Sequence, residues 1–290
     1  MRFLLRDHRV GQWIGPVYDR VLKELSAAGV DGVWSEEIPA QFQAGDVFVS
    51  HSPIDYREDF ETLPVFGLKL VNRRELLNLC GALGLSTIEW ASPDSLESAE
   101  VLFEEWKTSW LVFKPDSSFA RKGIRRWERG TPFPSDTNYD SSADVFMLPN
   151  EGGPKTIKVD IFYDKVISSR VFQTLPLESP DFYVPPVEES VQIHDDDQFM
   201  RMAELLGPRM VEFGSAYFSV DLMEHRGELR IIEINPANIG RKLPWSTWPG
   251  YIVPRYSRAV LSLLSLGEAL PTLREMRAIV TRLRESGREA

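Results

Sequence analysis

One stretch, residues 217–236, limits the fold of this chain more than any other. It consists of two runs, YFSVDLME at 217–224 and ELRIIEINP at 228–236, joined by a short turn that contains Gly227. Polar and apolar side chains alternate along both runs, which is the pattern of β-strands with one buried face. Glycine suits the left-handed backbone of a hairpin turn. The sequence therefore predicts a β-hairpin.

The predicted hairpin gathers three oxygen-bearing side chains on one face. A three-residue turn would place Asp221 opposite Ile231, with Glu233 as its diagonal neighbour and Asn235 farther along the same face. The opposite face would be the core side, formed by Val220, Leu222, Ile232 and Ile234. Three oxygen donors without a basic partner nearby in the sequence suit a hard cation such as Mg²⁺, which needs only one or two carboxylates and an amide oxygen. From spacing alone, a solvent-facing hairpin with ordinary surface acids is the alternative.

Composition and charge narrow the class of partner. A formal charge of -10 and a pI near 5.1 argue against a nucleic-acid partner, because neutralising a phosphate backbone requires a basic surface. The single Cys80 cannot form an internal disulfide, and its place on the apolar face of a predicted helix favours packing over a nucleophilic role. No Cys/His group has zinc-ligand spacing, and no apolar stretch is long enough to cross a membrane. We therefore expect a cytoplasmic protein.

The order of the predicted elements indicates an α/β protein with several lobes. Residues 1–71 alternate strands and helices, as a small α/β domain does. Residues 72–147 hold a helix, a strand that ends at Lys114, and a segment rich in Arg, Ser and Pro that we interpret as a mobile flap. Residues 148–260 carry two strand pairs, including the hairpin, and residues 261–290 form a helical segment.

Three segments, taken in order, resemble one superfamily of enzymes. Residues 111–115 read LVFKP and precede the predicted flap, a later strand pair carries Lys158 and Arg170, and the hairpin closes the series. Over about residues 70–245 this order is similar to that of the ATP-grasp superfamily, which includes D-Ala-D-Ala ligase, glutathione synthetase and the ribosomal-protein glutamate ligases. The resemblance implies an ATP-grasp fold with α+β lobes behind an N-terminal pre-ATP-grasp domain, and ATP and Mg²⁺ as cofactors. It also implies Asp221, Glu233 and Asn235 as the metal ligands.

The resemblance further implies which residues contact the phosphates. In the superfamily the lysine of a strand that ends in Lys-Pro contacts the nucleotide phosphates, and here that residue is Lys114; a point charge on a long stem suits this role. The flap would place Ser117, Ser118, Lys122 and Gly123 around the β and γ phosphates. The superfamily's flap carries several glycines and this one carries a single glycine, so the chain departs from the pattern there.

Adenine and ribose would lie near the hinge between the lobes. Backbone groups of the hinge hold adenine in the superfamily, which implies Met147 and Leu148 here, with Glu151 at the ribose hydroxyls. The superfamily also carries a lysine on the helix before the nucleotide lobe. This sequence has none there, and only Arg73 or Arg74 could substitute for it.

Two basic residues on the strand pair before the hairpin are candidates for catalysis. Resemblance to the glutamate ligases implies that Lys158 and Arg170 face the reacting phosphoryl and acyl groups. Fixed cations stabilise the negative charge that develops on an acyl phosphate. Pairing with nearby acids such as Asp160 is the alternative role.

The loop after the hairpin resembles the segment that receives the acceptor in related ligases. Arg241 would hold a substrate carboxylate through two hydrogen bonds, although a solvent-exposed loop residue fits the sequence equally well. Trp245 and Trp248 would stack on a substrate or pack between subunits of a homo-oligomer, and the sequence does not choose between these roles.

Together these expectations describe an ATP-dependent carboxylate–amine ligase that works through an acyl phosphate. Its substrates would be a small-molecule or peptide carboxylate and an amine, whose identities the sequence does not indicate. Two alternatives stay open: a small-molecule kinase of the same fold, and a nucleotide-binding module without turnover. Product analysis separates the ligase from the kinase, since a ligase releases phosphate together with a new amide.

Overall fold

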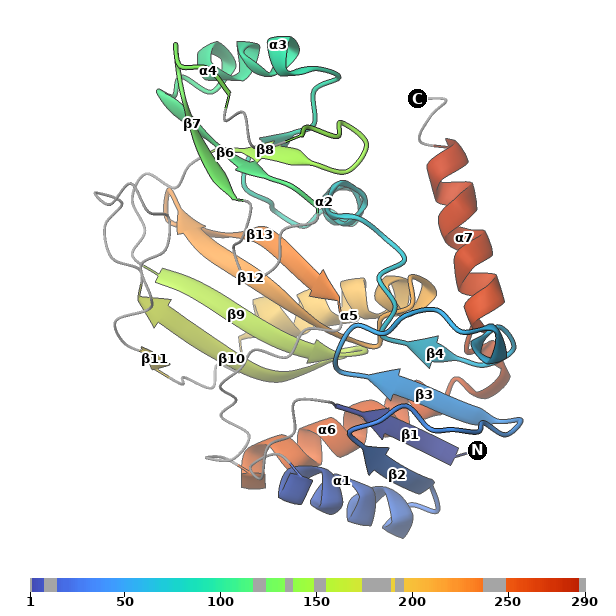
Figure 1. Ribbon diagram of the computed structural model, residues 1–290. Coiled ribbons are helices and arrows are strands. Elements are labelled where there is room, and N and C mark those ends of the chain that lie inside the picture. The colour runs from blue at the N-terminus through green and yellow to red at the C-terminus, as the bar shows by residue number, and fades with distance from the viewer. Residues whose placement is uncertain are drawn as a thin grey trace.

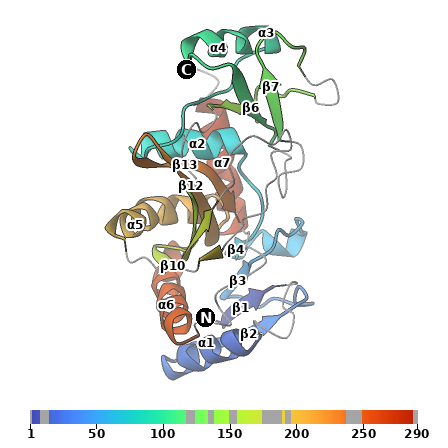
Figure 2. The same ribbon diagram turned by 90° about the vertical axis from the view of Figure 1, so that its left-hand side faces the viewer.

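The structure of the protein is a computed structural model in which three sheets lie one above another (Figure 1, Figure 2). It describes residues 2–7, 15–116, 124–133, 138–148, 155–173, 189–190, 196–236 and 249–286. In Figure 1 an N-terminal sheet lies lowermost, a large sheet occupies the middle and a small sheet lies at the top. None of the helices in these ranges is both long and apolar enough to cross a bilayer.

The N-terminal domain is built on a parallel sheet in the order β2-β1-β3-β4. Its elements are β1 (Arg2–Arg6), α1 (Gly15–Ala27), β2 (Asp31–Ser35), β3 (Asp46–Ser50), the 3-10 helix η1 (Glu58–Phe60) and β4 (Val65–Phe66). Every residue of β3 is buried, as expected for a central parallel strand that is covered on both faces. The alternation of strand and helix predicted for the first 71 residues is present.

Helix α2 (Arg73–Ala82) follows this domain and begins with a capping box. The Asn72 side chain accepts a hydrogen bond from the Glu75 backbone N–H at 2.9 Å, and the Glu75 carboxylate accepts one from the Asn72 N–H at 2.7 Å. Such reciprocal bonds satisfy two backbone donors that a helix start otherwise leaves without partners. The buried apolar side chains of α2 are Leu76, Leu77 and Cys80.

Cys80 is wholly buried on this helix, which sets its reactivity. Burial raises the pKa of the thiol to about 12. The thiolate, which is the reactive form, is therefore scarce at lower pH. We expect no labelling of Cys80 by a thiol reagent at pH 8 in the folded protein, and rapid labelling in guanidinium. Mass spectrometry of the labelled protein checks this, and fast labelling without denaturant would contradict the packing role.

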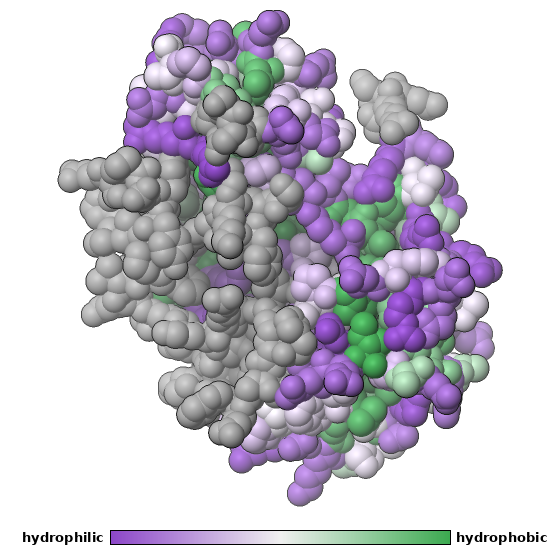
Figure 3. Space-filling model, in the orientation of Figure 1, coloured by the Kyte–Doolittle hydropathy of each residue, from purple (hydrophilic) through white to green (hydrophobic). Residues whose placement is uncertain are grey.

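The small lobe is a four-stranded antiparallel sheet in the order β5-β8-β6-β7. Its elements are β5 (Trp90–Ala91), α3 (Leu96–Ala99), α4 (Val101–Glu105), β6 (Trp110–Lys114), β7 (Arg125–Glu128) and β8 (Val145–Met147). One face packs an aromatic cluster against the helices, centred on Phe113, Trp127 and Phe146. The face of this lobe that is seen uppermost in Figure 3 is mainly hydrophilic. Strand β7 lies within the segment predicted as a flap, so part of that segment is sheet.

The large lobe carries a five-stranded antiparallel sheet in the order β11-β10-β9-β12-β13. Its strands are β9 (Lys155–Phe162), β10 (Lys165–Gln173), β11 (Glu189–Ser190), β12 (Tyr217–His225) and β13 (Glu228–Pro236). Helix α5 (Asp197–Glu212) packs across one face of this sheet (Figure 1) and buries Phe199, Met202 and Leu206 against its apolar side chains. The opposite face carries the polar residues of the candidate site.

Two C-terminal helices return to the N-terminal domain. Helix α6 (Pro249–Leu264) packs against α1 and shares a hydrophobic core with it. After the 3-10 helix η2 (Gly267–Ala269), helix α7 (Leu273–Ser286) buries three apolar side chains, Leu273, Met276 and Val280. The predicted helical segment 261–290 thus contains the end of α6 and a separate helix, α7.

The turn of the hairpin is shorter than predicted. Both Arg226 and Gly227 have positive φ angles, 52° and 81°, and His225 pairs directly with Glu228. Positive φ at both central residues defines a two-residue turn whose twist matches that of the flanking strands. The prediction of a three-residue turn is therefore wrong.

The register of the hairpin also differs, because a β-bulge at Ile232 adds one residue to β13. Asp221 consequently lies directly opposite Glu233, whereas Ile231 pairs with Leu222. The hairpin residues buried in the core behind it are Phe218, Val220, Leu222, Ile231 and Ile234. Ile232, predicted for that core, packs instead against the apolar cluster between the hairpin and the small lobe.

Candidate active site

The polar face of the large sheet carries two rows of side chains in register across four strands. The first row runs from β10 to β13 through Arg170, Lys158, Asp221 and Glu233. The second row lies two residues away on each strand and runs through Ser168, Asp160, Ser219 and Asn235. Alternate residues of a strand share a face, so both rows project from the same side of the sheet. The three predicted metal ligands therefore lie together.

Asp221 is held by neighbours on both sides. Its Oδ1 lies 2.9 Å from Nζ of Lys158, and its Oδ2 accepts a hydrogen bond from the Asn235 amide at 3.2 Å. No basic partner for these oxygen donors is expected nearby in the sequence. The partner comes from strand β9, 63 residues earlier in the chain.

Arg170 forms an ion pair in the interior of the same face. Its NH2 group lies 3.1 Å from Oδ2 of Asp160, and the two side chains are 2% and 0% exposed. Ser168 also donates a hydrogen bond to this carboxylate, at 2.8 Å. Arg170 thus pairs with Asp160, which is the alternative role that the sequence indicated for this residue.

Lys114 reaches the hairpin from the small lobe. It is the last residue of β6, and its Nζ lies 3.4 Å from the carbonyl oxygen of Ile232, the bulged residue. The bulge therefore presents a backbone acceptor towards the small lobe, in keeping with the tendency of bulges to redirect groups beside functional sites. The predicted phosphate-binding lysine and the predicted metal ligands meet at this point.

Glu233 is surrounded by positive charge. Its Oε1 lies 2.7 Å from NH2 of Arg73, which comes from the start of α2. Burial alone would raise the pKa of Glu233, but the charges of Lys114, Arg73 and Lys158 hold that pKa below its ordinary value. Glu233 is therefore ionised at neutral pH. Arg74 points elsewhere and donates to the carbonyl oxygen of Ser141.

The predicted hinge residues are buried. The side chains of Met147 and Leu148 are 2% and 7% exposed, and the Leu148 backbone N–H donates to the Glu89 carbonyl oxygen at 2.9 Å. That N–H is thus already engaged within the protein. The remaining predicted residues lie outside the described residues: Ser117, Ser118, Lys122, Gly123, Glu151, Arg241, Trp245 and Trp248.

The chemistry of this face fits a divalent cation that is shared with a nucleotide. Asp221, Glu233 and the Asn235 amide form the small oxygen set that Mg²⁺ uses when phosphates complete its coordination. Within the described ranges, no group of three or more His, Cys, Asp and Glu side chains could hold a metal. The buried hydroxyl of Ser219, in the middle of the second row, has no hydrogen-bond partner among the described residues. A polar group buried in this way is suited to a ligand.

Besides Asp160, which the sequence indicated only as a pairing acid, two members of the second row, Ser168 and Ser219, are not among the predicted site residues. Each stands two positions from a predicted one on the same strand, next to Arg170 and Asp221 respectively. The period of two along a strand is the signal that would have identified them.

No family model and no curated protein matches the sequence. Solved structures do match the fold. D-cycloserine synthetase DcsG aligns with a TM-score of 0.56 and 15% identity over 90% of this chain and 98% of that chain. Macrocyclase MdnC from Microcystis aeruginosa, bound with precursor peptide MdnA, aligns with a TM-score of 0.53 and 14% identity over 90% and 99%. ATP-grasp ligase PsnB, complexed with a minimal precursor, Mg and ADP, aligns at 0.51 and 16% over 90% and 96%.

The chain therefore has the fold of the ATP-grasp ligases. The predicted fold class is confirmed, and the likeness extends over nearly the whole length of each of these proteins.

Proposed function

We propose that this protein is an ATP-dependent ligase that joins a carboxylate to an amine through an acyl phosphate. One observation carries the proposal: Lys114 of the small lobe approaches Glu233 at the end of a row of charged side chains that continues through Asp221, Lys158 and Arg170. ATP and Mg²⁺ are the proposed cofactors. The similar structure of PsnB contains Mg and ADP, which supports that choice.

Each group of side chains has a distinct proposed role. Asp221, Glu233 and Asn235 would hold Mg²⁺, which when bound neutralises charge on phosphate oxygens. Lys114 binds the nucleotide phosphates from the small lobe, and Lys158 stabilises the phosphoryl group in transfer. Such transfers depend on positioning and charge stabilisation more than on covalent chemistry by the protein.

The proposed reaction has two steps. A carboxylate oxygen of the substrate bonds to the γ phosphorus as the bond to ADP breaks, which yields an acyl phosphate. The amine nitrogen then bonds to the acyl carbon, the bond to phosphate breaks, and the amine loses a proton. Arg170 is our candidate for stabilising the developing charge, and Arg241 is our candidate for binding a substrate carboxylate.

The similar structures support a choice of substrates to test. MdnC is bound with a precursor peptide and PsnB with a minimal precursor, whereas DcsG is a D-cycloserine synthetase. Peptides and small amino-acid-like molecules are therefore the substrates that we propose to test first.

A screen of amino acids and peptides for acceptor-dependent formation of ADP tests the proposal. We expect one pair of substrates to yield ADP, free phosphate and an amide product that mass spectrometry detects. A phosphorylated product would instead show a kinase. Nucleotide binding without ADP formation from any pair would favour a module without turnover.

A further inference from the structure

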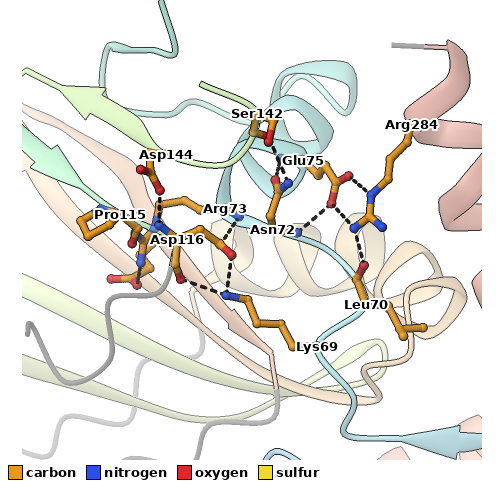
Figure 4. Close-up of polar contacts among 11 residues, drawn as sticks. Lys69, Leu70, Asn72, Arg73, Glu75, Pro115, Asp116, Ser142, Asp144 and Arg284 are labelled. Carbon is orange, nitrogen blue, oxygen red and sulfur yellow. Dashed lines mark hydrogen bonds and ion pairs between the residues drawn. The ribbon is translucent and has the colours of Figure 1, made fainter. Parts of the chain in front are cut away.

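The backbone N–H of Arg73 is held by a residue that lies just after the end of β6 (Figure 4). The Arg73 N–H donates to Oδ1 of Asp116 at 2.8 Å, and Oδ2 of the same carboxylate lies 2.8 Å from Nζ of Lys69. The Asp116 N–H in turn donates to Oδ1 of Asp144 at 2.7 Å. The start of α2 is thereby tied to the end of the strand that carries Lys114.

The same helix start is also held from the C-terminal end of the chain. Nε of Arg284, on α7, lies 2.6 Å from Oε1 of Glu75, the residue that closes the capping box with Asn72. Arg284 also donates to the Leu70 carbonyl oxygen at 2.8 Å (Figure 4). Two independent sets of contacts therefore set the position of Arg73.

The Arg73 side chain is buried and reaches acceptors in two separate segments of the chain. NH1 donates to the Pro115 carbonyl oxygen, and NH2 lies 2.7 Å from Oε1 of Glu233. The side chain is only 8% exposed. Because arginine keeps its charge at any ordinary pH, Glu233 faces a permanent cation that its surroundings hold in place.

We propose that Arg73 is a built-in counter-cation that makes metal binding at this site depend on the nucleotide, an inference that rests on the proposed function. The carboxylates of Asp221 and Glu233 are each matched by a cation, Lys158 and Arg73, so these two pairs together carry no net charge. A divalent ion that enters alone meets these two fixed positive charges at close range, together with Lys114, whose Nζ lies 3.4 Å from the carbonyl oxygen of the neighbouring Ile232. A nucleotide supplies the phosphate charge that offsets them.

Binding of Mn²⁺, measured by the loss of its free-ion EPR signal with and without AMP-PNP, tests the proposal. We expect the unmodified protein to bind Mn²⁺ weakly alone and strongly with the nucleotide. Arg73→Gln removes one fixed charge and should tighten binding of Mn²⁺ alone by about tenfold or more. Arg73→Lys keeps the charge, so its affinity for Mn²⁺ alone should stay weak.

Two further variants complete the design. Arg74→Gln changes the next residue of α2, which does not contact the carboxylates, and should leave both affinities unchanged. Lys158→Met removes the cation beside Asp221 and, like Arg73→Gln, should tighten binding of Mn²⁺ alone. This second variant keeps the test decisive if Arg73→Gln does not fold.

Any one of three results would overturn the role of Arg73. The first is tight binding of Mn²⁺ alone to the unmodified protein. The second is an affinity for Mn²⁺ alone that does not rise in Arg73→Gln, or in Lys158→Met if Arg73→Gln does not fold, and the third is an equal rise in Arg73→Lys. A merely structural role predicts loss of stability without any gain in metal affinity. Absence of Mn²⁺ binding even with AMP-PNP would instead refute the proposed function itself.

Discussion

Asp221→Asn and Glu233→Gln are each expected to lower kcat/KM for ATP turnover by about 10²–10³-fold. Both substitutions keep the shape of the side chain and remove the negative charge that would bind the metal. The two residues lie directly opposite each other on β12 and β13, so each change alters the same site. Coupled measurement of ADP formation, once the substrate screen has identified an acceptor, checks the prediction.

Glu228→Gln is the matched control for these variants. Glu228 lies on the same hairpin beside the turn, is largely exposed and pairs with Arg230. Its loss should change kcat/KM by less than about twofold, since an exposed ion pair contributes little free energy. Full activity of Asp221→Asn and Glu233→Gln would show that the chemistry takes place elsewhere.

Arg170→Met is expected to lower the free energy of unfolding by about 3–5 kcal/mol. The substitution leaves the Asp160 carboxylate buried without its cationic partner, and taking such a charge out of water is costly. The double variant Arg170→Met/Asp160→Asn removes that charge while an amide oxygen can still accept from Ser168, so it should recover a large part of the loss. Urea unfolding followed by circular dichroism measures both.

Lys165→Met provides the comparison on the same strand. Lys165 pairs with Asp164 at the exposed end of β10, and its removal should cost less than about 1 kcal/mol. A similar small loss for Arg170→Met would mean that the pair with Asp160 is not a structural requirement. Arg170 would then be available chiefly for the substrate.

The strands of the large lobe could be predicted because alternation along each strand is a local property. The hairpin of β12 and β13 is present, and its polar face carries Asp221, Glu233 and Asn235 as the sequence indicates. Its register could not be predicted, because a bulge at Ile232 leaves no mark on the pattern: isoleucine occupies both that position and the preceding one. Either could have faced the core.

The cations of the site were harder to foresee, because they come from distant parts of the chain. Arg73 meets Glu233 across 160 residues of sequence, and Arg284 reaches Glu75 across 209. Such pairs depend on how the lobes pack, which periodicity along one element does not encode. The sequence indicated only that Arg73 or Arg74 could replace a missing lysine, and the structure directs Arg73 to the site and Arg74 away from it.

A crystal structure of the protein with AMP-PNP and Mg²⁺ tests the central claim most directly. We expect the metal to lie at about 2.0–2.1 Å from oxygens of Asp221, Glu233 and Asn235. Nζ of Lys114 should lie within hydrogen-bond distance of a phosphate oxygen of the same nucleotide. A nucleotide bound away from the polar face of the large sheet, or a metal that touches neither carboxylate, would contradict the account.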